Sequence, residues 1–354
     1  MSRFWVDTVQ ALKPYVPGEQ PRSQTLLKLN TNEHALPPSE SAMAVLSSVD
    51  PDQLRRYPDP TARRLRDAIA NRESLGPEQV FVGNGSDEVL AHVWAAFLSG
   101  RELTTVKTTY GFYPVWSRLY GAQLNQVALC DDFSVDLNAL QAVGSAIVLA
   151  NPNAPTGLAL KRMQVEELVA SNRDRLVVID EAYFGFGAET AAPLVSDYDN
   201  LVVTRSLSKS HALAGLRVGY ALAHPELIEG LVRIKDSFNS YPIDALAQAV
   251  ATASIEDVDW FNRSSAVIAH SREKMSQGLQ ALRFVVLPSQ SNFVFVKHPA
   301  MSGKKIFNAL RERNILVRRW DTPFIAEWLR ISLGTAEETD QFLHAVNEIT
   351  ATGA

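Results

Sequence analysis

The sequence predicts an α/β protein with a mostly parallel sheet flanked by helices, a smaller α+β domain and an extended N-terminal arm. Short runs rich in Val, Ile and Leu alternate with longer helical patterns, which is typical of a buried parallel sheet. After about Ile243 the pattern changes to a long helical region followed by alternating, strand-like residues. The segment before about Tyr57 is rich in Pro, Asn and Ser, which favours an extended arm.

The expected sheet strands are short apolar runs, several of which end in polar residues: 79–83, 103–109, 146–150, 176–180, 201–206 and 217–223. Apolar residues at helical spacing predict helices at 61–71, 86–98 and 160–170, the second with Ser86 as its N-cap. The C-terminal part adds strand-like residues over 283–296, a helix near 304–313 and a strand at 329–333. We therefore expect an arm over 1–45, a large domain over 46–242 and a small domain over 243–354.

Composition excludes several classes of function. The 354 residues carry a net charge of −5, which argues against nucleic acid as a partner. Cys130 is the only cysteine and the seven histidines are scattered, so we expect no disulfide and no metal site. No signal-peptide pattern and no run of about 20 apolar residues occur, so we expect a cytoplasmic protein without a membrane partner.

The first candidate for chemistry is Lys209, in the segment SLSKS that follows an apolar strand. A lysine attacks an aldehyde only as the free amine, and burial or a neighbouring cation lowers its pKa toward that form. Ser206, Ser208 and Arg217 could hold a phosphate beside it. A lone lysine in a Ser-rich loop is more often a surface residue. The choice between a surface lysine and a catalytic one therefore depends on the residues at the ends of the other strands.

Those strand ends carry further polar residues. Asp180 leaves an apolar strand and needs a partner there, with Tyr183 close behind, although a strand-end carboxylate is also a common cap. The segment GNGSDE (83–88) turns through two glycines into a helix whose free N–H groups can receive a phosphate. It lacks the third glycine of a dinucleotide fingerprint, which weakens a hydride-transfer interpretation. Tyr110 is placed to offer an aromatic face to a flat ring.

Together these motifs resemble the aspartate-aminotransferase fold group of pyridoxal-phosphate enzymes, and most closely the histidinol-phosphate aminotransferase family. The resemblance covers nearly the whole chain, in this order: LKPYVPGEQP (12–21), LNTNE (29–33), RYPDP (56–60), GNGSDE (83–88), NPNAPTG (151–157), DEAY (180–183), SLSKSHALAGLRVGY (206–220), SNF (291–293), ILVR (315–318) and LRISLGT (329–335). It implies the type I fold of pyridoxal-phosphate-dependent transferases, with a seven-stranded sheet, and a homodimer with shared active sites.

The resemblance also implies pyridoxal 5'-phosphate as the cofactor and assigns it residues. Lys209 would bind the cofactor aldehyde as a Schiff base and later act as the base that moves the substrate proton. Asp180 would pair with the pyridinium nitrogen, Tyr183 with the phenolic oxygen, and Tyr110 would stack on the ring. The phosphate would be held by Ser86, the backbone amides of Asp87 and Glu88, Ser206, Ser208 and Arg217, with Tyr57 reaching it from the second subunit.

For substrates, the resemblance implies histidinol phosphate, with glutamate and 2-oxoglutarate as the other pair, in histidine biosynthesis. Arg330 would bind the amino-acid carboxylate with both arms of its guanidinium, a contact that lysine does not reproduce. Arg318 would meet the substrate phosphate, and Tyr15 of the N-terminal arm would line the pocket from the neighbouring subunit.

Two segments depart from the family pattern. Ala154 stands where the usual NPNNPTG has asparagine, so a hydrogen bond to the cofactor's phenolic oxygen is lost unless Asn153 or water supplies it. Residues 32–36 read NEHAL where NENPYG is common, near the substrate. The alternatives are therefore an aromatic amino-acid aminotransferase or a phosphothreonine-type decarboxylase. A non-catalytic cofactor-binding regulator is a further alternative, although no basic DNA-binding region precedes Tyr15.

Overall fold

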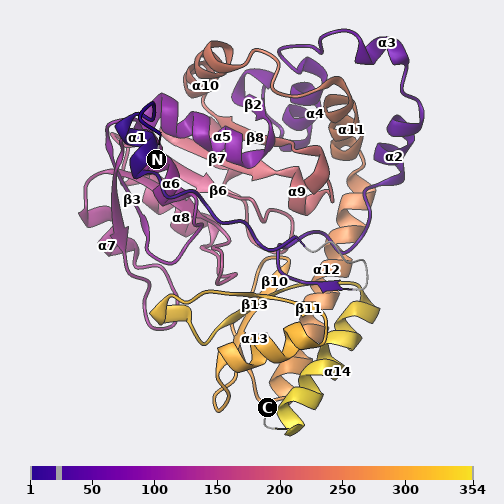
Figure 1. Ribbon diagram of the computed structural model, residues 1–354. Coiled ribbons are helices and arrows are strands. Elements are labelled where there is room, and N and C mark those ends of the chain that lie inside the picture. Colours follow the sequence, from indigo (N-terminus) through magenta and orange to yellow (C-terminus); the bar gives the residue numbers. More distant parts are fainter. Residues whose placement is uncertain (1, 21–25, 353–354) are drawn as a thin grey trace.

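The structure, a computed structural model, describes residues 2–20 and 26–352. Met1, residues 21–25 of the expected arm and 353–354 of the expected small domain lie outside the described residues. Within them, the central element is a seven-stranded sheet in the order β2-β8-β7-β6-β5-β3-β4 (Figure 1). Its strands are β2 (Val80–Gly83), β3 (Glu102–Val106), β4 (Gln123–Val127), β5 (Ala146–Ala150), β6 (Val177–Asp180), β7 (Leu201–Ser206) and β8 (Gly219–Ala223).

Only β8 runs against the other strands of this sheet, pairing antiparallel with β2 and β7, and the described neighbours from β7 to β4 are parallel. Strands such as β6 and β8 are buried along their whole length, which explains their unbroken apolar runs. The predicted fold class is confirmed. Strand β4 was not predicted, because its sequence QLNQV is largely polar and half-exposed at the sheet edge.

Helices cover both faces of the sheet. One face packs against α5 (Gly85–Val93), α6 (Tyr113–Leu119) and α10 (Pro225–Phe238), through an aromatic-rich core that includes Trp94 and Trp116. The other face packs against α4 (Arg63–Glu73), α7 (Leu137–Ala142), α8 (Arg162–Ala170) and α11 (Ala245–Glu256). The sheet therefore separates two distinct buried environments.

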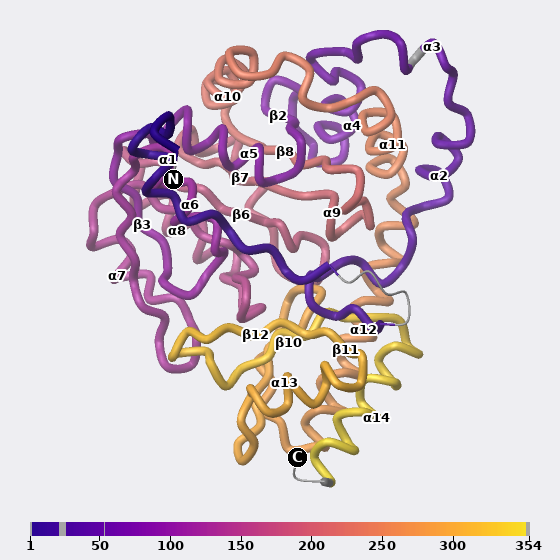
Figure 2. The backbone as a smooth tube through the Cα atoms, in the orientation of Figure 1, coloured from indigo at the N-terminus to yellow at the C-terminus, as the bar shows by residue number. Residues whose placement is uncertain are grey.

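A smaller α+β part follows, shown in orange and yellow in Figure 1. It contains α12 (Val258–Ala281), α13 (Gly303–Glu312), α14 (Ala336–Thr352) and an antiparallel sheet of β9 (Val285–Val286), β10 (Phe293–Lys297), β12 (Arg318–Arg319) and β13 (Leu329–Ser332). The N-terminal strand β1 (Leu27–Lys28) pairs with β11 (Ile315–Leu316), so the chain that Figure 2 traces in indigo from α1 reaches this part before it turns back. This crossing places residues 29–33 between the two parts.

Several local predictions are wrong. The segment before Tyr57 is not all extended: it contains α1 (Asp7–Ala11), α2 (Glu40–Ser47) and α3 (Pro51–Leu54), and α2 begins where Ser39 Oγ accepts a hydrogen bond from Ala42 N–H. Ser86 is not the N-cap of α5, since Gly85 turns the chain with a φ of 81° and Ser86 already lies in the first helical turn. The predicted helix 86–98 ends as a π-helical segment, Trp94–Leu98. The structure also has short 3-10 helices at Pro77–Gln79, Ala192–Ser196, Ala214–Leu216 and Pro323–Ile325.

Candidate active site

A cavity of about 750 Å³ lies at the carboxyl ends of the parallel strands, where the arm, the large sheet and the small domain meet. Most of the residues singled out from the sequence line it: Tyr15, Ser86, Asp87, Tyr110, Asp180, Tyr183, Ser206, Ser208, Lys209, Arg217, Arg318 and Arg330. Their separation in sequence exceeds 300 residues, so the fold alone brings them together.

Lys209 lies in α9 (Leu207–Ser210), the single helical turn after β7. Ser206 caps this turn by accepting a hydrogen bond from Ser208 N–H at 3.2 Å. The Lys209 Nζ donates to the backbone oxygen of Thr31 at 2.7 Å. Burial, reinforced by the Arg330 guanidinium, lowers the pKa of Lys209 to about 8. An appreciable fraction of the amine is therefore unprotonated near neutral pH, the form that attacks an aldehyde.

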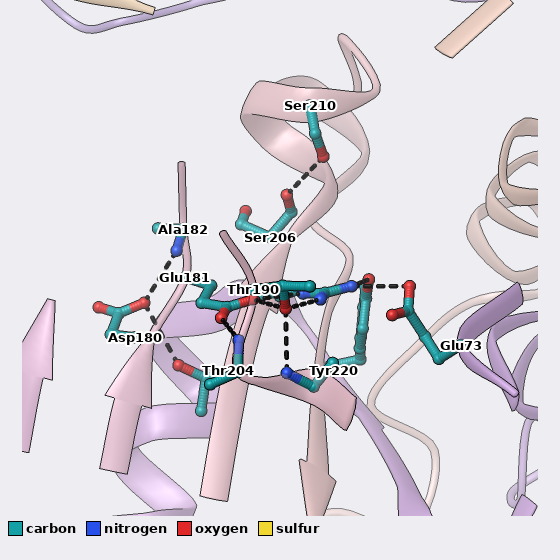
Figure 3. A network of polar contacts seen from close by, with 12 residues as sticks. Glu73, Asp180, Glu181, Ala182, Thr190, Thr204, Ser206, Ser210 and Tyr220 are labelled. Carbon is teal, nitrogen blue, oxygen red and sulfur yellow. Dashed lines mark hydrogen bonds and ion pairs between the residues drawn. The ribbon is translucent and has the colours of Figure 1, made fainter. Parts of the chain in front are cut away.

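Asp180, the last residue of β6, is buried, and its hydrogen-bond donors among the described residues are all uncharged. Its Oδ2 accepts from Tyr113 Oη at 2.9 Å, and its Oδ1 accepts from Ala182 N–H at 3.2 Å and Thr204 Oγ1 at 3.3 Å. Burial raises the pKa of Asp180 to about 6, against these hydrogen bonds. Figure 3 shows its carboxylate pointing away from that of its neighbour Glu181. At neutral pH Asp180 is thus mainly a buried anion, suited to a cationic ring nitrogen.

The start of α5 and the loop before β8 form a cradle for an anion. Arg217, with a φ of 56°, donates to Ser208 Oγ at 3.2 Å and pairs with Asp87 at 3.4 Å. Gly85 has a φ of 81°, which other residues rarely adopt, and a Cβ there would lie 2.4 Å from Arg217 Nη2 and displace the guanidinium. Hydroxyls, a guanidinium and a helix N-terminus converge here, which fits a phosphate group.

The acidic side chains of α5 do not oppose an anion at this cradle. Asp87 accepts a hydrogen bond from Tyr110 Oη at 2.8 Å in addition to its pairing with Arg217. Glu88 folds back to accept from Asn84 N–H at 2.6 Å and does not line the cavity. Both carboxylates are therefore already engaged, and Asp87 lines the cavity beside Ser86 as part of a pair with Arg217.

Two arginines form the opposite wall. Arg318 and Arg330 lie directly opposite each other on β12 and β13, an arrangement of like charges that destabilises a sheet by itself. Both guanidinium carbons lie over the ring of Trp320, at 5.5 and 5.3 Å from its centroid. Arg330 donates to the backbone oxygen of Asn30 at 3.0 Å, while its buried Nε has no hydrogen-bond partner among the described residues. This wall fits a substrate with negative groups.

Residues 29–33 form a strap across the cavity. The sequence marked them only as the motif LNTNE and gave them no role in the site. Asn32, with a φ of 55°, donates to Tyr183 Oη at 2.8 Å and accepts from Ser332 Oγ at 3.0 Å. The strap therefore orients the partly buried Tyr183 at the same time as Thr31 contacts Lys209. Only the tertiary structure places these residues beside β6 and α9.

Ala154, the first departure from the family pattern noted above, lines the cavity. Asn153 does not take over its position, because its amide donates to the Thr108 backbone oxygen at 3.0 Å and to Thr156 Oγ1 at 3.1 Å. Tyr183, whose hydroxyl accepts a hydrogen bond from Asn32, also lines this cavity.

Tyr15 and Tyr57, both expected to contribute to a neighbouring subunit's site, lie in different surroundings. Tyr15 lines the cavity of its own chain, with its ring 4.3 Å from that of Phe112, whereas we expected it from a neighbouring subunit. Tyr57 lies outside this cavity and is 82% exposed, with its ring stacked on Tyr241 at 4.7 Å. Sequence analysis also missed Tyr113 and Thr204, which contact Asp180, because their aromatic and apolar surroundings are typical of core.

No group of three or more His, Cys, Asp or Glu side chains in the described part of the chain is arranged to hold a metal ion. Across residues 2–20 and 26–352, no helix combines the length and apolar character that a membrane span requires.

Comparisons with known proteins identify the family and the fold. The family Aminotransferase class I and II matches residues 24–346. A histidinol-phosphate aminotransferase from Gluconacetobacter diazotrophicus is 51% identical over 100% of both chains. A histidinol-phosphate aminotransferase 1 from Bradyrhizobium diazoefficiens is 51% identical over 99% of this chain and 100% of its own. The crystal structure of histidinol-phosphate aminotransferase from Sinorhizobium meliloti in complex with pyridoxal-5'-phosphate superimposes with a TM-score of 0.89 at 25% identity, covering 100% of this chain and 99% of that one.

The family match over residues 24–346 and the shared fold show that the chain is a class I and II aminotransferase. Within that class, the chain belongs to the histidinol-phosphate aminotransferase family.

Proposed function

We propose that this protein is a histidinol-phosphate aminotransferase that uses pyridoxal 5'-phosphate to exchange an amino group between glutamate and imidazole-acetol phosphate in histidine biosynthesis. The observation that carries the proposal is the meeting of Lys209, Asp180, Arg217 and Arg330 in one cavity, in a chain about half identical to named members of the family.

The cavity fits the cofactor. When bound, pyridoxal phosphate supplies an aldehyde and an electron-accepting ring that stabilises negative charge on the substrate carbon. Arg217, Ser208 and the start of α5 would bind its phosphate, and Gly85 leaves the space that the guanidinium needs. Asp180 would receive the protonated ring nitrogen, and Tyr110 would cover one face of the ring.

Lys209 has the chemistry for two roles. Its lowered pKa provides a free amine for covalent attachment, and the same amine, once released, can accept and return a proton at the substrate carbon. Thr31 is a neutral contact for Nζ, so Lys209 is not locked in an ion pair. Asp180 is held in place by the hydrogen bonds that it accepts from Tyr113, Ala182 and Thr204, so its carboxylate is already positioned before a ligand binds.

Arg330 and Arg318 support the substrate assignment. A carboxylate and a phosphate are the two negative groups that the paired substrates bring, and guanidinium groups bind both with two parallel hydrogen bonds. The unpartnered Nε of Arg330 leaves a donor for such a ligand. The cationic wall favours histidinol phosphate over phenylalanine, whose side chain is neutral.

We extend the proposal to a homodimer in the cytoplasm, in which Tyr57 enters the partner's active site. Tyr57 and Tyr241 form an exposed stacked pair outside this chain's own cavity, and Phe238 and Leu54 add exposed apolar surface, 77% and 64% accessible. Sedimentation equilibrium tests the dimer, and Tyr57→Phe should weaken cofactor binding if the hydroxyl reaches the partner's phosphate site.

Turnover with three amino donors tests the substrate. Histidinol phosphate, phenylalanine and threonine phosphate are each supplied with 2-oxoglutarate, and glutamate formation and carbon dioxide release are measured. We expect the highest kcat/KM with histidinol phosphate and no decarboxylation. A preference for phenylalanine, decarboxylation of threonine phosphate, or cofactor binding without any turnover would each point to one of the alternative functions.

A further inference from the structure

Tyr113 is a buried tyrosine that contacts the site residue Asp180 without lining the cavity. It begins α6 with a side chain 0% exposed, and it does not line the cavity. Its ring stacks on Trp94 with centroids 5.6 Å apart and meets Tyr110 edge-on at 5.7 Å. Its hydroxyl donates to Asp180 Oδ2 at 2.9 Å. The packing leaves the ring little freedom, so the hydroxyl is held against one oxygen of that carboxylate.

This hydrogen bond is the shorter of two side-chain donations to Asp180. Thr204 supplies the other at 3.3 Å, to Oδ1, and the backbone N–H of Ala182 also donates to Oδ1. Among the described residues, Oδ2 accepts from Tyr113 and keeps a second lone pair for another donor, and Asp180 lines the cavity. Asp87, Tyr110 and Tyr183 are further titratable groups that interact with the Asp180 charge from the surrounding elements.

We propose that Tyr113 is a positioning residue that keeps the Asp180 carboxylate ionised and aims its free lone pair at the cofactor's ring nitrogen. The inference rests on the proposed function, because it requires that pyridoxal phosphate bind with its ring nitrogen against Asp180. Tyr113 itself touches neither cofactor nor substrate and acts only through this carboxylate.

The physical consequence is a shift in the acid limit of cofactor binding. Burial raises the pKa of Asp180 and the Tyr113 hydroxyl opposes that rise, because the hydrogen bond stabilises the ionised form. Removing the hydroxyl raises the pKa of Asp180 further, by about one pH unit for a hydrogen bond to a charged group. Protonated Asp180 cannot pair with a protonated ring nitrogen, so binding should weaken at a higher pH than in the wild type.

The test measures the dissociation constant of pyridoxal phosphate by tryptophan fluorescence at pH values from 5.5 to 8.5, starting from protein stripped of cofactor. Three variants are compared with the wild type: Tyr113→Phe, Thr204→Val and Tyr198→Phe. Tyr198 is a matched control, since it is a buried tyrosine whose hydroxyl donates to another carboxylate, Glu166, at 3.1 Å. Dividing each variant's constant by the wild-type value removes the pH dependence that Lys209 and the cofactor share.

For Tyr113→Phe we expect this ratio to stay near its alkaline value at pH 8 and to rise severalfold, approaching about tenfold, by pH 5.5. Thr204→Val should show a smaller rise of the same sign, because its bond to Asp180 is longer. Tyr198→Phe should give a flat ratio.

If the ratio of dissociation constants for Tyr113→Phe were unchanged, or raised equally at every pH, the proposal would be overturned. A purely structural role would not make the ratio rise at low pH. If that variant does not fold, a flat ratio for Thr204→Val overturns it instead. A wild type that binds no pyridoxal phosphate would refute the proposed function rather than the role of Tyr113.

Discussion

Two buried polar clusters lie on opposite faces of strands β6 and β7, and they differ in how their charges are paired. Asp180 pairs in register with Thr204 and points into the cavity, whereas the next residues, Glu181 and Arg205, point to the other face. Adjacent positions in β7 and at the end of β6 thus supply one cluster that holds the sheet to its helices and one that faces the active site.

The cluster around Arg205 is saturated. Arg205, only 1% exposed, pairs with Glu181 at 2.9 Å and Glu73 at 2.7 Å, and it also donates to Tyr220 Oη at 3.2 Å. Its guanidinium carbon lies 3.6 Å from the centroid of the Phe184 ring. Burial opposes its charge, but Tyr220, Glu181 and Glu73 outweigh burial and raise the pKa of Arg205. Because these charged groups are already paired with one another, we assign this network a structural role.

The cluster around Lys209 is left incomplete. The Lys209 amine contacts a backbone carbonyl, Asp180 accepts only from neutral donors, and the Nε of Arg330 has no described partner. Buried charges without counter-charges cost stability and are retained where a ligand completes them. The comparison teaches that pairing, rather than burial alone, separates structural from functional charge in this protein.

The largest effect should follow from Lys209→Ala. Because both covalent attachment and proton transfer depend on its amine, kcat should fall by about 10⁴-fold or more, while the cofactor-free protein keeps its fold. Steady-state turnover and circular dichroism measure the two properties. Lys274→Ala, which removes a partly exposed ion pair with Asp340, serves as the control and should leave both unchanged.

The converse variant is Arg205→Met. Removing this guanidinium leaves Glu181 and Glu73 buried without a cation, so the free energy of unfolding should drop by about 3–5 kcal/mol. Urea unfolding measures the loss, and the folded fraction should still bind pyridoxal phosphate normally. A stable Arg205→Met protein with impaired cofactor binding would reverse the roles that we assign to the two clusters.

A third variant, Arg330→Lys, keeps the charge and removes the planar fork. We expect kcat/KM for glutamate to fall on the order of 10²-fold, mainly through KM, with the cofactor's spectrum unchanged. Arg319→Lys on the neighbouring strand position is the control, because Arg319 is already occupied by Asp321 and the backbone oxygen of Ala326. If both substitutions lowered kcat/KM equally, the loss would come from general disruption of the strands, and the specific role of Arg330 would be contradicted.

The smallest effect concerns stability and pH. Lys209 has a folded-state pKa of about 8, below its usual 10.5, so the unfolded chain binds more protons between these values and stability rises with pH there. The destabilising contribution is therefore fully present below pH 8. Lys209→Met should stabilise the cofactor-free protein at pH 7, on the order of 1 kcal/mol, and the gain should shrink as pH rises above 8. A thermal-melting series over pH 7–10 checks this, and a variant less stable than the wild type at pH 7 would contradict it.

Local sequence predicted most of the strands and the polar residues at their ends, because those signals lie within a few residues of each other. It missed β4, where QLNQV carries too little apolar residue to mark an edge strand. It also missed Tyr113 and the strap residue Asn32, whose contacts with Asp180 and Tyr183 join positions 67 and 151 residues apart. Contacts between residues so far apart in the sequence depend on the tertiary structure, and no local sequence pattern reveals them.

The central claim is that the amine at position 209 forms the covalent bond to pyridoxal phosphate. Borohydride reduction of the holoprotein, followed by digestion and mass spectrometry, tests it directly. We predict a single stable adduct on the peptide that contains Lys209, accompanied by loss of the visible absorbance band and absent from Lys209→Ala. An adduct on a different lysine, or none at all in protein that has taken up the cofactor, would contradict the account.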